Sequence, residues 1–138
     1  MFNSFFKKGA KAALKKYQEQ FDERKSKVKL QPVKTLLAGV RYDNEDGSSR
    51  QKIIGKLKLG EDLILERDTE NKFDDAAVKV CRVGGEQIGF LDMDIAVEIN
   101  ARLKEGSRVD AKVTSINYIG KFKEVEIQLQ KHSRRIKS

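Results

Sequence analysis

The sequence is poor in the residues on which disulfide frameworks, zinc sites and many enzymes depend. Its 138 residues include one cysteine, one histidine, one proline and no tryptophan. A lone Cys81 excludes an intramolecular disulfide, and with His132 as the only histidine a structural zinc site is excluded as well. No apolar run approaches the roughly 18 residues of a membrane-spanning helix, and the N-terminus lacks the apolar core of a secretory signal. We therefore expect a cytoplasmic protein that binds no metal and no cofactor.

Patterns typical of enzymes are missing too. The sequence contains no glycine-rich nucleotide loop, no GxSxG nucleophile motif and no HExxH zinc motif. Cys81 lies among apolar residues of a predicted strand, where a buried and unreactive thiol is usual. The carboxylates of residues 43–46 and 70–75 match no calcium-loop pattern and are interpreted as loop caps and solvated turns. The sequence therefore predicts a protein that is not an enzyme.

Positive charge is abundant, and it is unevenly distributed. The formal net charge is +8. Residues 1–35 carry ten Lys/Arg against three Asp/Glu, whereas residues 36–131 carry sixteen against eighteen and residues 132–138 add three positive charges. Basic segments attract nucleic acid or anionic membranes with little discrimination. Selective recognition must therefore come from a shaped site in the central part of the chain.

Residues 2–22 have the pattern of an amphipathic helix, with lysines opposite an apolar stripe. The stripe consists of Phe2, Phe6, Ala10, Ala13, Leu14, Tyr17 and Phe21. Three uses stay open. The stripe packs on the domain or on a second copy of the chain, it lies on a membrane surface, or the lysines follow DNA. A charged linker that contains Pro32 and runs through residue 34 separates this helix from the domain.

From residue 35 the sequence becomes typical of short strands joined by turns. The predicted strands cover residues 35–42, 62–68, 77–83, 86–91, 109–118 and 123–130. Gly84-Gly85 and Gly120 mark the turns of two hairpins. The alternation of the fifth strand changes phase at Ile116, which predicts a β-bulge.

Two short helices interrupt these strands. Ser48 or Ser49 caps a helix that runs through Leu57, and Asp92 caps a second helix that ends before Gly106. With no βαβ repeat, the elements favour a mainly β fold, a small and partly closed antiparallel barrel of about six strands. The predicted organisation is residues 1–34 as helix and linker, residues 35–131 as the domain, and residues 132–138 as a basic tail.

Two aromatic residues stand outside the periodic pattern of the core. Tyr42 closes a predicted strand beside Arg41, and Phe73 lies in an acidic loop beside Asp74. An exposed ring at the mouth of a barrel stacks on a nucleic-acid base, worth about 1–3 kcal/mol. An ionised Asp74 accepts a hydrogen bond from a hydroxyl and repels phosphate. The alternative is that both rings plug the ends of the barrel and that Asp74 caps its loop.

Four ordered blocks resemble the HIRAN domain family. They are residues 38–42 (AGVRY), 63–67 (LILER), 71–74 (NKFD) with 77–80 (AVKV), and 87–91 (QIGFL). The resemblance spans roughly residues 34–131. It implies an OB-like barrel, found fused to fork-remodelling helicases and as standalone bacterial proteins, and in the eukaryotic members this barrel captures the 3′ end of single-stranded DNA.

The resemblance also implies roles for individual residues. Arg41 and Tyr42 match the segment that contacts the terminal nucleotides, Tyr42 by stacking. Asn71, Phe73 and Asp74 match the loop that encloses the 3′ end, with Asp74 at the 3′-hydroxyl. The predicted DNA-binding residues are Arg41, Tyr42, Asn71, Phe73, Asp74 and Phe90.

The sequence departs from the family pattern at several positions. Lys72 stands where the family usually has proline, and Ala76 stands where it has asparagine. DNA-binding relatives present basic residues after the last block, whereas this chain has Asp92, Met93 and Asp94. These acids weaken the case for phosphate contacts there. Either the lysines of the helix at residues 2–22 compensate for them, or the ligand is a different one.

The sequence therefore predicts a non-catalytic module that binds single-stranded DNA at a 3′-hydroxyl end, with a DNA-processing protein as a further partner. The alternative is a protein that interacts with other proteins or a membrane surface through residues 2–22. The oligomeric state stays open.

Overall fold

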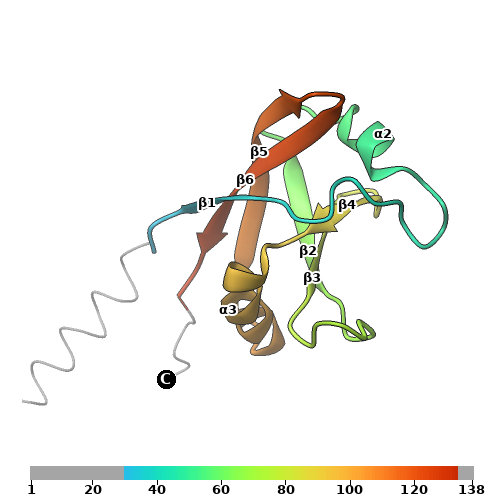
Figure 1. Ribbon diagram of the computed structural model, residues 1–138. Helices are drawn as coiled ribbons and strands as arrows, with labels where there is room; N and C mark the ends of the chain where they lie inside the picture. The colour runs from blue at the N-terminus through green and yellow to red at the C-terminus, as the bar shows by residue number, and fades with distance from the viewer. Residues whose placement is uncertain (1–29, 134–138) are drawn as a thin grey trace, which may run out of the picture.

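A single antiparallel sheet carries the fold of the computed structural model, which describes residues 30–133 (Figure 1). The elements are β1 (Val33–Leu36), α2 (Arg50–Ile54), β2 (Asp62–Arg67), β3 (Val78–Arg82), β4 (Gln87–Phe90), α3 (Met93–Lys104), β5 (Val109–Ile119) and β6 (Phe122–Lys131). The strand order in the sheet is β1-β6-β5-β2-β3-β4. The predicted helix at residues 2–22 and residues 134–138 of the tail lie outside the described residues.

The sheet curls until its two ends meet. Just after β1, the amide of Ala38 donates to the carbonyl of Phe90 at 2.8 Å, and the amide of Phe90 donates back at 2.9 Å. Gly89 permits this closure, because a Cβ at that position would lie 2.7 Å from the carbonyl oxygen of Ala38. The predicted mainly β fold, a partly closed antiparallel barrel of six strands with two short helices, is confirmed.

The interior of the half-barrel is filled by alternate residues of the strands and by both helices. The side chains of largest volume that are fully buried are Ile54, Val78, Val80, Ile88, Ile99, Val113, Val125, Ile127 and Leu129. Each such residue stabilises the fold by about 1.5–3 kcal/mol relative to an exposed position. The predicted bulge is confirmed, since the pairing of β5 with β6 shifts register between Val113 and Ser115.

Both helices begin where the sequence predicts. Ser49 accepts a hydrogen bond from the amide of Lys52 at 3.2 Å at the start of α2, and Asp92 accepts from the amide of Asp94 at 3.2 Å at the start of α3. The first helix ends at Ile54 rather than at Leu57. Within residues 30–133, neither helix is long and apolar enough to cross a membrane.

The prediction of one strand over residues 35–42 is wrong in its second half. β1 ends at Leu36, and beyond the single bridge at Ala38 the chain turns away from the sheet. The reason is Gly39, whose φ of +67° is incompatible with a strand and is rarely adopted by other residues. The amide of Tyr42 donates to the carbonyl of Gly39 at 3.3 Å, which closes the turn.

Candidate functional site

The turn from Gly39 to Tyr42 passes directly over the end of β4. A Cβ at Gly39 would lie 3.5 Å from the ring of Phe90 and 4.0 Å from the ring of Tyr42, so both rings border this glycine. The Tyr42 side chain is 72% exposed, and Arg41 is exposed beside it. Tyr42 therefore does not plug the barrel; its ring lies on the surface.

A buried arginine supports this turn from below. Arg50, the first residue of α2, is only 7% exposed. Its Nη1 donates to the carbonyl of Gly39 at 2.8 Å, and its Nε donates to Oδ1 of Asn44 at 2.7 Å. The guanidinium also lies 5.2 Å from the centre of the Phe90 ring. Burial lowers the pKa of Arg50, yet a guanidinium remains charged at neutral pH.

Arg41 connects the turn to the hairpin of β5 and β6. Its guanidinium lies over the ring of Phe122 at 4.5 Å, within the range of a cation–π contact. Gln51 of α2 ties the same elements together. Its Nε2 donates to the carbonyls of Val40 and Lys123, both at 2.9 Å, and its Oε1 accepts from the amide of Lys123 at 2.8 Å. The turn is thus anchored to both α2 and β6.

The loop between β2 and β3 holds the second group of predicted residues. The side-chain oxygen of Asn71 accepts from the amides of Phe73 at 2.9 Å and Asp74 at 3.0 Å. Oδ1 of Asp74 accepts from the amide of Ala76 at 2.9 Å. These bonds shape a loop in which the Phe73 ring is 98% exposed, and Oδ2 of Asp74 makes no hydrogen bond within the described residues. Asp74 does cap its loop, as the alternative reading held, but Phe73 plugs nothing.

The two groups lie on either side of the end of β4. The turn contacts Phe90, and the loop runs into β3 at Val78, whose carbonyl accepts from the amide of Leu91. Figure 1 shows the loop extending beyond β2 and β3 on the side of α3, whereas α2 lies on the other side, beside the tip of the β5–β6 hairpin. Within residues 30–133, no hydrogen bond or ion pair joins the loop to residues 39–42. The structure therefore groups Arg41 and Tyr42 with Phe90 and places Asn71, Phe73 and Asp74 farther along.

Three of these supporting residues were not predicted from the sequence. Arg50 and Gln51 open a short helix, where nothing local indicates that one is buried and the other spans three segments. Phe122 follows the turn at Gly120, and this position is the only sequence signal that singles it out. Their importance arises from contacts with residues that are distant in the sequence.

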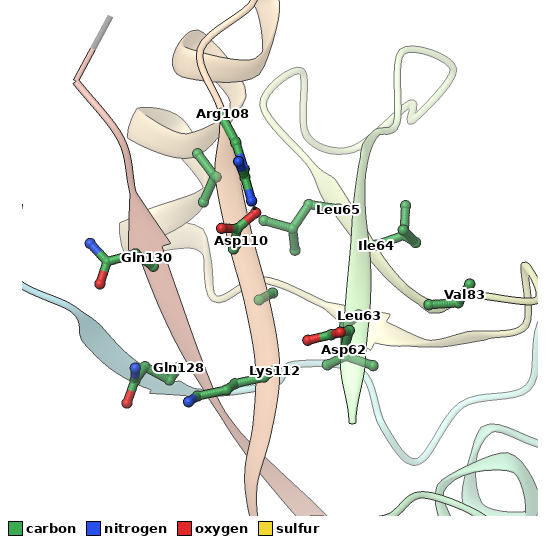
Figure 2. A pocket seen from close by; sticks show the side chains of 12 residues that line it. Asp62, Leu63, Ile64, Leu65, Val83, Arg108, Asp110, Lys112, Gln128 and Gln130 are labelled. Carbon is green, nitrogen blue, oxygen red and sulfur yellow. Dashed lines mark hydrogen bonds and ion pairs between the residues drawn. The ribbon is translucent and has the colours of Figure 1, made fainter. Parts of the chain in front are cut away.

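A hollow on another part of the sheet contains none of the predicted site residues. β2 and β5 pair only at Asp62–Lys112 and Leu63–Ala111 and then part, which leaves an open depression of about 730 Å³ (Figure 2). Its polar wall includes Arg108, whose Nε donates to Oδ1 of Asp110 at 3.0 Å. This hydrogen bond lowers the pKa of Asp110. Arg108 and Asp110 thus pair with each other at the edge of this hollow.

The part of the chain that the structure describes offers little for catalysis or metal binding. Cys81 is buried, and burial raises the pKa of its thiol, which disfavours the reactive thiolate. No cluster of three or more His, Cys, Asp or Glu side chains suitable for a metal ion occurs among residues 30–133.

Comparisons with known proteins assign the fold. The family model of the HIRAN domain matches residues 31–129. The crystal structure of the HIRAN domain of human HLTF is similar with a TM-score of 0.59 and 20% identity, over 75% of this chain and 77% of that one. A crystal structure of a Lactobacillus plantarum protein is similar with a TM-score of 0.58 and 21% identity, over 76% of this chain and 96% of that one. The NMR structure of the HLTF HIRAN domain is similar with a TM-score of 0.52 and 20% identity, over 81% of this chain and 84% of that one. A search of curated proteins finds no match.

Proposed function

Because the chain belongs to the HIRAN domain family, we propose that it is a non-catalytic nucleic-acid-binding module that captures single-stranded DNA at a 3′-hydroxyl end. One observation carries the proposal. Two aromatic rings, Tyr42 and Phe73, are 72% and 98% exposed in segments that both adjoin the Phe90 end of β4. Exposed rings held by structured loops are the platforms on which single-stranded bases stack.

The chemistry of Asp74 supports binding at an end of the strand. Its Oδ1 is used by the loop, and Oδ2 is left as an acceptor. A carboxylate repels the phosphates of a continuous strand but accepts a hydrogen bond from a hydroxyl. A DNA strand presents a free hydroxyl only at its ends. Asp74 therefore favours a terminal nucleotide over an internal one, and the family resemblance supports the 3′ end.

The test compares labelled single strands that differ only in a 3′-hydroxyl or a 3′-phosphate, by fluorescence anisotropy at matched salt. We expect the wild-type protein to prefer the hydroxyl and Asp74→Asn to reduce this preference, because an amide also donates to phosphate. A charge-assisted hydrogen bond of about 1.5–3 kcal/mol sets the scale. Asp75→Asn is the matched control, since it removes the same charge from the next residue and should leave the preference intact. Equal wild-type affinity for both ends would remove Asp74 from the site.

Tyr42→Ala tests stacking separately. We expect both strands to bind about 1–3 kcal/mol more weakly, with little change in melting temperature because the ring is exposed. A lower melting temperature with unchanged binding would instead assign Tyr42 a structural role. The earlier alternative, interaction with a protein or membrane through residues 2–22, concerns a segment outside the described residues.

A further inference from the structure

Charges of opposite sign lie on opposite sides of Phe90. The side formed by the β2–β3 loop and the start of α3 is the acidic flank, and it consists of Asp68, Glu70, Asp74, Asp75, Asp92 and Asp94, with Lys72 as its one lysine. The side formed by α2 with the turn that follows it, by Arg41 and by the hairpin tip is the basic flank, and it consists of Arg41, Lys52, Lys56, Lys121 and Lys123. The two flanks lie at opposite ends of the candidate site (Figure 1).

The basic flank is formed by segments that pack against one another. Arg41 and Lys121 both approach the ring of Phe122, at 4.5 and 5.8 Å. The ammonium of Lys123 lies at the end of α2, 3.3 Å from where a Cβ of Gly55 would be. Lys52 and Lys56 are exposed on the same helix and the turn that follows it. The cations therefore come from three segments that Gln51 holds together.

Within residues 30–133, the five cations of the basic flank form no ion pair, although Asp43 and Glu124 stand in the same stretches of chain. In contrast, Arg82, Arg108 and Lys131 elsewhere on the domain are each paired. Unpaired cations on a shared surface attract a polyanion, and the affinity rises with each phosphate neutralised. The flank thus presents five cations, unpaired among the described residues, on neighbouring segments.

We propose that Lys52, Lys56, Lys121 and Lys123 bind the phosphates of the strand on the 5′ side of the captured end. This inference rests on the proposed function and adds the direction in which the strand leaves the site. The acidic flank repels phosphates and faces the terminal hydroxyl, so the strand departs across Tyr42 and Arg41 toward α2 and the hairpin tip. The acids at Asp92 and Asp94 close the other route, along the start of α3.

The experiment uses the full chain and two sets of substitutions that remove the same charge. The test set is Lys52→Gln, Lys56→Gln and Lys121→Gln, and the control set is Lys34→Gln, Lys104→Gln and Lys112→Gln, which are exposed lysines on β1, α3 and β5. The probes are 5′-labelled single strands with a 3′-hydroxyl, one of about four nucleotides and one of about twelve, the range of an OB-fold site. Melting curves confirm that both variants are folded.

We expect the test set to weaken binding of the longer strand and to reduce the slope of log affinity against log salt by about two, at about 0.7 per phosphate contact. The test set should change the binding of the shorter strand little, and the control set should leave the binding of both strands nearly unchanged. If the test-set and control-set variants bind the longer strand with equal affinity while the preference for a 3′-hydroxyl is retained, the inference is overturned but the proposed function is not. Loss of any end preference in the wild-type protein overturns the proposed function and the inference with it.

Discussion

Replacing Arg50 by methionine tests whether this buried residue supports the candidate site without itself contacting a ligand. Arg50 is buried, and methionine retains much of its apolar length while it removes the guanidinium. The change deprives Oδ1 of Asn44 of its hydrogen bond at 2.7 Å and the carbonyl of Gly39 of its bond at 2.8 Å. Gly39 keeps the weaker bond from the amide of Tyr42 at 3.3 Å.

The magnitude follows from these two acceptors. An acceptor left buried without a donor costs about 1–3 kcal/mol. Because Asn44 and Gly39 are only half-buried and Gly39 keeps a second bond, we expect a total of about 1–3 kcal/mol for the two acceptors. Since small domains are stable by about 5–15 kcal/mol, Arg50→Met should fold but melt earlier, by about 4–8 °C for each kcal/mol lost. Arg50→Lys keeps a charge but not the planar fork, and its melting temperature should fall in between.

The assay combines thermal unfolding with strand binding well below the melting temperature. We expect Arg50→Met to weaken binding even when folded, because the turn that presents Tyr42 loses one of its anchors and keeps that of Gln51. Arg82→Met is the control, since Arg82 pairs with Glu61 at 2.8 Å away from this turn, and an ion pair that water still reaches contributes about 1 kcal/mol or less. An Arg50→Met protein with an unchanged melting temperature would refute this account of the turn.

Three further predictions concern the basic segment at residues 1–29, the closure of the barrel and acid stability. Removing residues 1–29, which carry nine Lys/Arg and three Asp/Glu, should flatten the salt dependence of DNA binding, and a slope equal to that of the full chain would contradict the role given to this segment. Gly89→Ala should destabilise the domain strongly, because the new Cβ would lie 2.7 Å from the carbonyl oxygen of Ala38. Gly84→Ala, with open space around it, should melt nearly as the wild type does, and equal melting of the two variants would argue against a tight closure. The hydrogen bond from Arg82 lowers the pKa of Glu61, so this pair stabilises the fold above the ordinary glutamate pKa of about 4.3 and is lost as the pH falls through the lower, folded-state pKa. Glu61→Gln should therefore remove part of the acid destabilisation, about 1 kcal/mol or less for a pair that water still reaches, and an unchanged pH profile would count against it.

The strands and caps were predictable because their signals are local. Val125, Ile127 and Leu129 alternate with polar residues, and the structure buries all three. Ser49 and Asp92 are residues that favour helix caps, and both cap the helices that follow them. Even the bulge in β5 left a signal, since the alternation of apolar residues changes phase where the pairing shifts register.

The end of β1 and the support of the site were not predictable in the same way. Residues 35–42 are apolar enough to suggest one strand. Only the tertiary position of Gly39, beside Phe90 and Arg50, shows why the chain turns there. Arg50 is a charged residue whose burial depends on Asn44 and Gly39, six and eleven residues earlier. A buried charge is stabilised by such partners, and partners of this kind leave no periodic signal in the sequence.

The distribution of charge determines what kind of selectivity this domain could have. Residues 36–131 carry more acids than bases, and the surplus of positive charge lies in residues 1–35 and 132–138. On the proposed function, the basic segments and the basic flank attract phosphates whatever the base sequence is, and stacking of bases on Tyr42 and Phe73 is also tolerant of sequence. Asp74, on the acidic flank, is the group in the proposed site whose interaction changes sign with the chemistry of the ligand, from repulsion of phosphate to acceptance from a hydroxyl. On the proposed function, the protein therefore distinguishes strand ends from strand interiors and is largely indifferent to base sequence.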